Sequence, residues 1–282
     1  MGKFTNVLFT SDFDHTLSAM DGAVPKKNIE AIRYFISEGG RFTINSGRSI
    51  PLLRSKLALV PVNAPCLCYN GAACYDFSDE TLLYSHPLPD FAPEVLRAAQ
   101  AYDPTLIMEV QRLDAHYSIG ESPLRREFLR REGIASIASA AEIPQPWMKI
   151  ILCAVDSEET LERPNDISSE VNAQMETLTK TMRELCKGHC YVTRSMPRLL
   201  EIGRLGCDKG SAARDLAKRL GCSLVVCAGD APNDLEMLQD ADFSFAPADC
   251  DPSVRALPGI RLTAPCGEGC VADAIAQLEK LL

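Results

Sequence analysis

Two acidic clusters, each placed directly after a short apolar run, constrain this chain more than any other feature. Asp12-Phe13-Asp14-His15-Thr16 follows the run Val7-Leu8-Phe9. Far along the chain, Gly229-Asp230-Ala231-Pro232-Asn233-Asp234 follows Leu224-Val225-Val226-Cys227. Each apolar run is typical of a short buried strand, and in an open α/β sheet functional groups gather where strands end. We therefore expect both clusters to meet at one edge of a sheet and to hold one hard cation through oxygen atoms.

The first 85 residues alternate between segments typical of strands and segments typical of helices. Strands are predicted over residues 7–11, 41–45 and 66–69. Helices are predicted over residues 27–38 and 51–59, because apolar residues recur there at helical spacing. The dipeptide Asn70-Gly71 predicts a turn, with residues 72–75 as the returning strand of a hairpin. This order of elements predicts a parallel sheet with helical crossovers.

The pattern changes near Ser85, where three prolines within seven residues mark a break. Up to about Ser195, hairpin-like strands mix with helices, which is typical of an α+β module. The helices are predicted over residues 93–102, 123–131 and 170–186. The strands are predicted over residues 106–110, 116–119 and 148–155.

After Arg198 the alternation of strands and helices returns. Strands are predicted over residues 199–202, 224–227 and 243–246, and helices over residues 209–220, 233–238 and 270–282. We predict an α/β fold in which residues 1–85 and 196–282 form a doubly wound, Rossmann-like parallel sheet core. Residues 86–195 are predicted to form an α+β domain inserted into that core.

Composition limits the classes of protein to which the chain can belong. The 282 residues are 46% hydrophobic and 24% charged, which is ordinary for a globular protein with a large core. No run approaches the roughly 18 apolar residues of a membrane span, and the N-terminus lacks the pattern of a secretory signal. The formal net charge of −9 disfavours nucleic-acid binding, which needs a basic face. A cytoplasmic protein, monomeric or homodimeric, is expected.

Twelve cysteines are many for this length, and without a secretory signal they are expected to be reduced thiols. The pairs Cys66/Cys68, Cys186/Cys190 and Cys266/Cys270 do not have the two-residue spacing of zinc knuckles, so a structural zinc site is not expected.

The cluster at Asp12 contains two carboxylates two residues apart, which point the same way in an extended segment. Asp12 could give one oxygen to a metal ion and attack an electrophile with the other. Asp14 could protonate a leaving oxygen and later activate water. The same string is also typical of a turn followed by a helix cap, so alone it does not decide between a site and a turn.

Further residues at predicted strand and helix ends favour a phosphate site. Ser46 ends the second strand, and its hydroxyl with the amides near Gly47 could hold phosphate oxygens. Lys209 opens a helix, where the free amides already favour an anion. Asp230 is placed as a further metal ligand, while Asn233 and Asp234 fit either a site or a helix cap. All of these residues occurring at strand ends in one chain favours the site.

This ordered set of motifs resembles the haloacid dehalogenase superfamily over nearly the whole chain. The motifs are the string Asp12-Phe13-Asp14-His15-Thr16, then Ser46, Lys209 and the cluster that contains Asp230. The long insert is similar to a type 2B cap, as in the Cof-like subfamily of sugar-phosphate phosphatases. The strings Asn70-Gly71-Ala72 and Cys207-Asp208-Lys209-Gly210 also look like that subfamily.

The resemblance implies a Mg²⁺-dependent phosphatase in which Asp12 is the nucleophile and Asp14 the general acid/base. It implies that Asp12, the main-chain carbonyl of Asp14, and Asp230 hold Mg²⁺. The residues expected at the phosphoryl group or the substrate are Ser46, Gly47, Arg48, Asn70, Lys209 and Asn233. Thr16 and Asp234 are expected to support them, Asp234 by orienting Lys209 or a metal-bound water.

His15 departs from the family pattern, since most relatives have glycine there. We expect the fold to tolerate this residue, because histidine accepts left-handed backbone angles better than most residues. A side chain at this position could change the geometry of the loop or the orientation of Asp14, and through them the catalytic rate.

The substrate is expected to be a small phosphorylated metabolite, with a sugar phosphate as the first hypothesis and an aspartyl-phosphate intermediate. A phosphomutase, or a phosphatase specialised for sucrose- or glucosylglycerate-type phosphates, fits the same motifs. A catalytically silent binding protein of this fold is the alternative outside the enzymes. In the cap, Trp147 and residues 111–114 are possible substrate contacts. Arg112 and Arg48 could bind a second acidic group, although a solvated arginine is the more ordinary interpretation of each.

Overall fold

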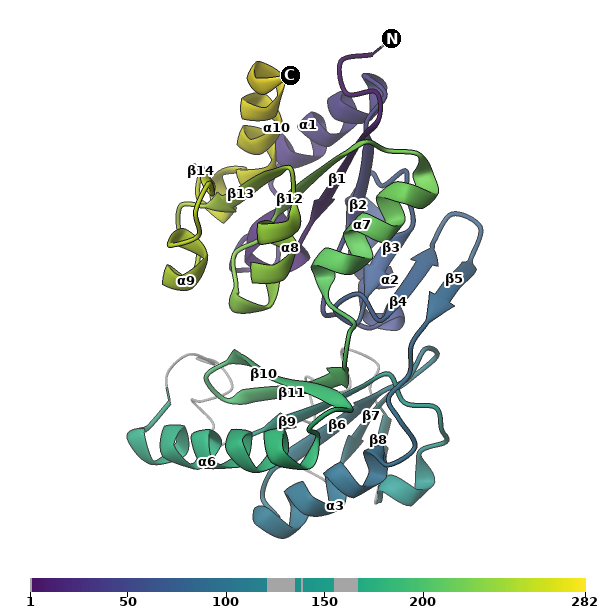
Figure 1. The fold of residues 1–282 in the computed structure, drawn as a ribbon, viewed down its shortest axis with the longest axis vertical. Helices are drawn as coiled ribbons and strands as arrows, with labels where there is room; N and C mark the ends of the chain where they lie inside the picture. The colour runs from purple at the N-terminus through teal and green to yellow at the C-terminus, as the bar shows by residue number, and fades with distance from the viewer. Residues whose placement is uncertain (1, 121–134, 138, 155–166) are drawn as a thin grey trace. The chain divides into compact units, whose positions relative to one another are not determined.

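The structure is a computed structural model of the chain, and it describes residues 2–120, 135–137, 139–154 and 167–282 (Figure 1). The chain divides into two compact units. The first comprises Met1–Arg48, Leu53–Ser85 and Cys207–Leu282, and the second comprises Ser49–Leu52 and His86–Gly206. The predicted helix over residues 123–131 lies outside the described residues.

A five-stranded sheet in the order β14-β13-β12-β1-β2 forms the centre of the first unit, and every neighbouring pair is parallel. This arrangement confirms the predicted parallel core sheet. Its strands are β1 (Val7–Ser11), β2 (Arg41–Ile44), β12 (Leu224–Ala228), β13 (Phe243–Pro247) and β14 (Arg261–Thr263).

Helices cover both faces of this sheet (Figure 1). Successive residues of a strand point to opposite faces, and all five residues of β1 are buried, so both faces need to be covered. Phe9 of β1 packs its ring 5.8 Å from that of Phe35 in α1, while Leu8 belongs to a cluster with Leu216 of α7. The helices of the first unit are α1 (Lys26–Ser37), α7 (Lys209–Leu220), α8 (Leu235–Asp240), α9 (Pro252–Arg255) and α10 (Cys270–Leu281), while α2 (Ile50–Lys56) contains residues of both units.

A small antiparallel sheet, β3-β4-β5, continues from the end of β2 through a parallel bridge between Asn45 and Leu67. The predicted hairpin is present as β3 (Cys66–Cys68) and β4 (Ala73–Asp76), whereas β5 (Thr81–Ser85) was not predicted. Gly71 has a φ of +89°, and a Cβ atom there would lie 2.4 Å from the carbonyl oxygen of Asp208. Glycine therefore lets this turn approach the start of α7 closely.

The second unit contains a six-stranded sheet in the order β10-β11-β9-β6-β7-β8, antiparallel except for the β7–β8 pair. One face of the sheet packs with α3 (Ala92–Tyr102) and α6 (Ser169–Leu185) to form a hydrophobic core, which confirms the inserted α+β module. The strands are β6 (Ile107–Gln111), β7 (His116–Ile119), β8 (Ala135–Ile137), β9 (Lys149–Cys153), β10 (Cys190–Met196) and β11 (Leu199–Arg204).

The strand over Leu199–Arg204 lies in a different unit from the one expected. We predicted a return to the core after residue 195, but β11 pairs with β9 and β10 of the second unit. The chain enters the first unit again at Cys207. The strand itself was predicted, but its apolar pattern does not specify which sheet supplies its partners. Pro197 and Arg198 form the turn that joins β10 and β11 into a hairpin.

Short helical turns complete the described elements: η1 (Phe13–Leu17), η2 (Leu57–Leu59), η3 (Ala140–Glu142), η4 (Pro232–Asp234) and η5 (Cys266–Glu268). In the part of the chain that the structure describes, no helix combines the length and the apolar character needed to cross a membrane. All twelve cysteines are free thiols.

Candidate active site

The two acidic clusters meet because the strands that precede them are neighbours. Strands β1 and β12 are parallel, and Ser11 at the end of β1 is paired with Ala228 at the end of β12. The amide of Asp12 donates a hydrogen bond of 2.9 Å to the carbonyl of Ala228. The chain therefore places Asp12 and Asp230 at the same edge of the sheet, although 218 positions separate them in the sequence.

Lys209, the first residue of α7, is buried between two carboxylates of this edge. Its Nζ donates to Oδ1 of Asp12 at 2.6 Å and to Oδ1 of Asp234 at 2.7 Å. Burial alone would lower the pKa of Lys209, but the charges of Asp12 and Asp234 outweigh it and raise that pKa. Lys209 is therefore a fixed positive charge at this site.

The loop after β12 fixes the position of Asp234. Oδ2 of Asp234 accepts hydrogen bonds from the amides of Asp230, at 3.0 Å, and Ala231, at 3.1 Å. A Cβ atom on Gly229 would lie 2.6 Å from the Cβ and Cγ atoms of Asp234, so only glycine leaves room for this side chain. Both oxygens of Asp234 are thus engaged, one with Lys209 and one with the main chain.

The carboxylates of Asp12, Asp230 and Asp234 each place one oxygen within 4.8 Å of the others, a group able to hold a metal ion. Thr16 donates a hydrogen bond of 2.6 Å to Oδ1 of Asp230. Burial, followed by repulsion from neighbouring carboxylates, raises the pKa of Asp230. Burial also raises the pKa of Asp12, although Lys209 opposes the shift.

Three carboxylates and one lysine leave this group with a net negative charge when all of them are ionised, and the raised pKa values of Asp12 and Asp230 have that repulsion among their causes. A divalent cation bound by oxygen ligands would supply the missing charge, so the donor set fits Mg²⁺. Within this group, both oxygens of Asp234 accept hydrogen bonds, one from Lys209 and the other from the amides of Asp230 and Ala231.

Asp14, also predicted in this site, has its carboxylate outside the acidic group found in the described residues. Arg48 donates from Nε to Oδ2 of Asp14 at 2.7 Å and from Nη2 to Oδ1 at 2.8 Å. Burial would raise the pKa of Asp14, but these hydrogen bonds and the charge of Arg48 outweigh it and lower that pKa. Between Asp12 and Thr16, His15 adopts a φ of 59° and a ψ of 9°, the left-handed conformation considered for it from the sequence.

Ser46 is buried beside the end of β2. Its hydroxyl oxygen accepts a hydrogen bond of 3.2 Å from the amide of Arg48, and its carbonyl accepts one of 3.1 Å from the amide of Asn70. Asn70, with a φ of 55°, is linked to Asn233 by a hydrogen bond of 3.4 Å between the side chains. The turns that follow β2, β3 and β12 are therefore connected to one another.

Asn45 contributes to the site, although the sequence did not identify it as a site residue. Its Nδ2 donates a hydrogen bond of 2.8 Å to the carbonyl of Lys209, and the whole side chain is buried. This bond connects the first turn of α7 to the end of β2 and so fixes the position of the main chain at Lys209. The sequence does show an asparagine at the end of a predicted buried strand, directly before Ser46. A buried amide requires hydrogen-bond partners, so this position could have been identified as one that holds a neighbouring segment in place.

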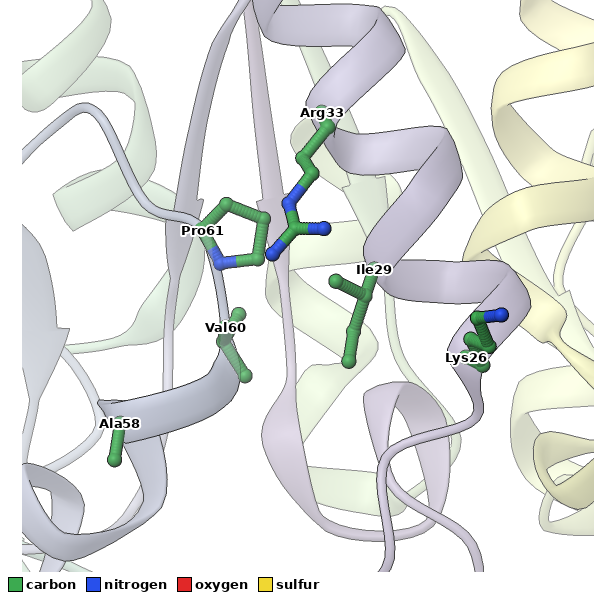
Figure 2. Close-up of a pocket in the computed structure, with 6 residues that line it drawn as sticks. All are labelled: Lys26, Ile29, Arg33, Ala58, Val60 and Pro61. Atoms are coloured by element: carbon green, nitrogen blue, oxygen red, sulfur yellow. The ribbon is translucent and has the colours of Figure 1, made fainter.

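A pocket of about 360 Å³ in the first unit shares no residue with this site (Figure 2). It lies beside α1 and the segment after η2, and the guanidinium of Arg33 reaches toward Pro61 in it. Its lining residues are Lys26, Ile29, Arg33, Ala58, Val60 and Pro61. None of the residues predicted for catalysis or phosphate binding lies in this pocket.

Comparison with known proteins shows which family has this arrangement. The model of the haloacid dehalogenase-like hydrolases matches residues 9–258. An HMP-PP phosphatase from Escherichia fergusonii is 26% identical over 261 residues, which is 90% of this chain and 89% of that protein.

Among solved structures, a HAD/COF-like hydrolase from Plasmodium vivax has a TM-score of 0.79 and 22% identity, and covers 100% of this chain and 97% of its own. A sugar phosphatase of HAD subclass IIB has a TM-score of 0.77 and 18% identity, with coverage of 97% and 99%. The matched model spans most of the sequence, and the family predicted from the motifs is confirmed. The chain belongs to the haloacid dehalogenase-like hydrolases.

Proposed function

We propose that this protein is a Mg²⁺-dependent phosphatase that hydrolyses a small phosphorylated metabolite, first of all a sugar phosphate, through a phospho-aspartyl intermediate on Asp12. The first unit is the proposed catalytic core and the second the proposed cap. The protein is further proposed to act in the cytoplasm as a monomer or homodimer.

The single observation that carries this proposal is the arrangement around Asp12. One oxygen of its buried carboxylate is held by Lys209 at 2.6 Å. Among the described residues, no donor bonds the other oxygen, and Asp230 lies at the same strand edge. A buried carboxylate with one oxygen fixed by a cation and one oxygen available is the geometry that a nucleophilic aspartate needs.

The proposed reaction has two displacements at phosphorus. Asp12 attacks the phosphoryl group, the ester P–O bond breaks, and Asp14 gives a proton to the leaving oxygen. Water, losing a proton to Asp14, then attacks the phosphorus of phospho-Asp12 and restores the free carboxylate. Lys209 neutralises charge on the phosphoryl oxygens, and the hydroxyl of Ser46 with the amide of Gly47 binds them.

Asp12, Asp230 and the main-chain carbonyl of Asp14 are the groups proposed to hold Mg²⁺. The ion supplies positive charge that screens the carboxylate of Asp12 from the anionic phosphate when it is bound. Asp234 is proposed to orient Lys209, since its carboxylate holds that ammonium at 2.7 Å. Asn70 and Asn233, joined to each other, are proposed to contact the substrate.

The named relatives support this class of reaction and leave the substrate open. An HMP-PP phosphatase and a sugar phosphatase are both similar to the chain, and they act on different leaving groups. A phosphomutase, or a phosphatase for sucrose- or glucosylglycerate-type phosphates, would use the same residues. A catalytically silent protein is disfavoured, because Asp12, Asp14, Lys209 and Asp230 are all present.

Phosphate release from phosphomonoesters, with and without Mg²⁺, tests the proposal. We expect Mg²⁺-dependent release by the parent protein and a loss of at least about a thousandfold in Asp12→Asn. Asp21→Asn, an exposed carboxylate nearby in sequence, is the matched control and should retain the parent rate. Hydrolysis by folded Asp12→Asn at the parent rate would show that Asp12 is not the nucleophile. Isomerised sugar phosphate in place of free phosphate would favour the phosphomutase.

A further inference from the structure

Asn45 follows the last residue of β2 with its side-chain amide inside the first unit, where an apolar residue would be cheaper to bury. Its exposed fraction is 0%, and its main-chain amide donates a hydrogen bond of 2.8 Å to the carbonyl of Ser11. Among the described residues, no group donates a hydrogen bond to Oδ1 of Asn45. A buried acceptor without a partner carries an uncompensated desolvation cost. The packing at the end of β2 therefore does not explain this amide, and the reason for it lies in what its NH₂ group contacts.

The NH₂ group of Asn45 contacts two helices, α7 and α8. Nδ2 donates a hydrogen bond of 2.8 Å to the carbonyl of Lys209, in the first turn of α7. The same nitrogen lies 3.4 Å from the sulfur of Met237, a buried residue of α8. A thioether sulfur is a weak acceptor, so this nitrogen has an acceptor on each of the two helices. One side chain beside the end of β2 thus holds α7 and α8 at the same point.

These two helices position the ion pair at the centre of the site. Lys209 begins α7, while Asp234 directly precedes α8 and lies three positions before Met237. The ammonium of Lys209 donates to Asp234 at 2.7 Å and to Asp12 at 2.6 Å. Both bonds are kept only while the main chain of Lys209 holds its place relative to α8 and to the end of β1. The amide of Asn45 is bonded to that main chain and contacts α8, so it constrains this place.

We propose that Asn45 is a positioning residue of the phosphatase. It holds the start of α7 against α8, so that the ammonium of Lys209 is fixed where the charge of the phosphoryl group develops. Asn45 acts through Lys209 and does not touch the substrate. This inference rests on the proposed phosphatase function and deepens it, because a fixed charge stabilises a transition state only if it is in place before the reaction begins.

The first test compares Asn45→Leu with the parent protein, with p-nitrophenyl phosphate and Mg²⁺. Leucine branches at Cγ as asparagine does, so this variant keeps the shape and removes the donors together with the unpartnered oxygen. We expect kcat to fall by about ten- to a hundredfold, the effect of a small displacement of a catalytic group, and by a larger factor than KM rises. The Tm should stay within about 3 °C of the parent value, because losing the unpartnered acceptor offsets the lost hydrogen bond.

Asn63→Leu is the matched control, at the other end of the same strand. Oδ1 of Asn63 accepts a hydrogen bond of 2.8 Å from the amide of Phe42, and its Nδ2 donates one of 3.0 Å to the carbonyl of Gly40. Both groups of this amide therefore have partners, and the partners lie at the start of β2, away from the strand end that carries the site. We expect Asn63→Leu to lower the Tm and to keep the parent kcat.

A second variant, Asn45→Asp, gives a readout that a purely structural role would not produce. A neutral carboxyl group can donate one hydrogen bond to the carbonyl of Lys209, whereas an ionised one cannot. Burial raises the pKa of a carboxyl group, so the neutral form is favoured at acidic pH. We expect kcat relative to the parent to be highest at about pH 6 and to fall severalfold by about pH 8, while the relative kcat of Asn45→Leu stays level.

A lower Tm with an unchanged kcat in Asn45→Leu would show that Asn45 only stabilises the fold, and would overturn this inference. The same relative kcat at both pH values in Asn45→Asp would also overturn it. If Asn45→Leu does not fold, the pH profile of Asn45→Asp decides. Absence of phosphate release by the parent protein would instead overturn the proposed function itself.

Discussion

Arg48 holds the carboxylate of Asp14 through two parallel hydrogen bonds, at 2.7 and 2.8 Å. The pair brings together the end of the first acidic cluster and the turn after β2, and it keeps the pKa of Asp14 below its ordinary value. Asp14 is consequently an anion at neutral pH in this arrangement. An ionised Asp14 has no proton to give. If it is the acid that protonates the leaving group, its carboxylate has to separate from Arg48, or the charge of Arg48 has to be shared with the substrate, so that Asp14 can first bind a proton.

Replacing Arg48 by methionine should lower stability in a way that depends on pH. An acid whose pKa is lowered by folding contributes stability above its unfolded pKa, near 3.8, and loses it as pH falls through the folded value. We expect Arg48→Met to cost at most ~1 kcal/mol at neutral pH, because the carboxylate is partly exposed. Urea unfolding should show this cost shrinking as pH falls below about 4. Arg48→Lys should lose part of the effect, and a cost that grows on acidification would contradict the pairing.

Replacing Lys209 by methionine should leave two buried carboxylates without their cation. We expect a loss of about 3–5 kcal/mol in the free energy of unfolding near pH 8. The loss should be smaller near pH 5, since the protein can then protonate Asp12, whose pKa is already raised. Lys218→Met is the control on the same helix, where the lysine side chain is 80% exposed, and it should change stability by less than about 0.5 kcal/mol. Equal losses in the two variants would mean that Lys209 is not the buried counter-charge.

Mg²⁺ should stabilise the protein more at alkaline than at acidic pH. Folding raises the pKa of Asp12 from 3.8 to about 7 and that of Asp230 to about 8. Acids shifted upward contribute stability at low pH, and that contribution is lost as pH rises from about 4 to about 8. A bound cation offsets the loss, so we expect the gain in Tm from saturating Mg²⁺ to increase to about 5 °C across this range.

Differential scanning calorimetry with Mg²⁺ or with EDTA would measure this gain. Asp230→Asn should remove most of it, while Asp242→Asn, a carboxylate bonded to Arg214 outside the acidic group, should keep it. A gain that does not change with pH in the parent protein would argue against a metal site at Asp12 and Asp230.

Replacing Gly229 by alanine should disturb Asp234. The added Cβ would lie 2.6 Å from two atoms of that side chain, so either the loop or the carboxylate must move. We expect a loss of ~1–3 kcal/mol in unfolding free energy, as for other overpacked sites, with a lower kcat because Lys209 loses its partner. Gly267→Ala is the comparison, since its nearest neighbour atom would be 3.8 Å away. Similar stability in both variants would show that the loop yields without cost.

Much of the fold was predictable because it depends on local patterns. The helices α1 and α7 and the strands β1, β2 and β12 lie within one residue of their predicted bounds, since amphipathic spacing and apolar runs are read from neighbouring residues. Strand β10 was not predicted, and β11 was assigned to the wrong unit. The two strands pair with each other as a hairpin, and β11 also pairs with β9, about 50 residues earlier in the chain.

The sequence by itself determined the family, the parallel core and the identity of the acidic residues, because strand-end motifs carry their own local signal. Only the tertiary structure decided how those residues are paired. It placed Lys209 between Asp12 and Asp234 and paired Arg48 with Asp14. Pairing of this kind depends on distances between side chains far apart in the sequence and on which of them are shielded from water. Those distances and that shielding arise only when the sheets and helices pack together.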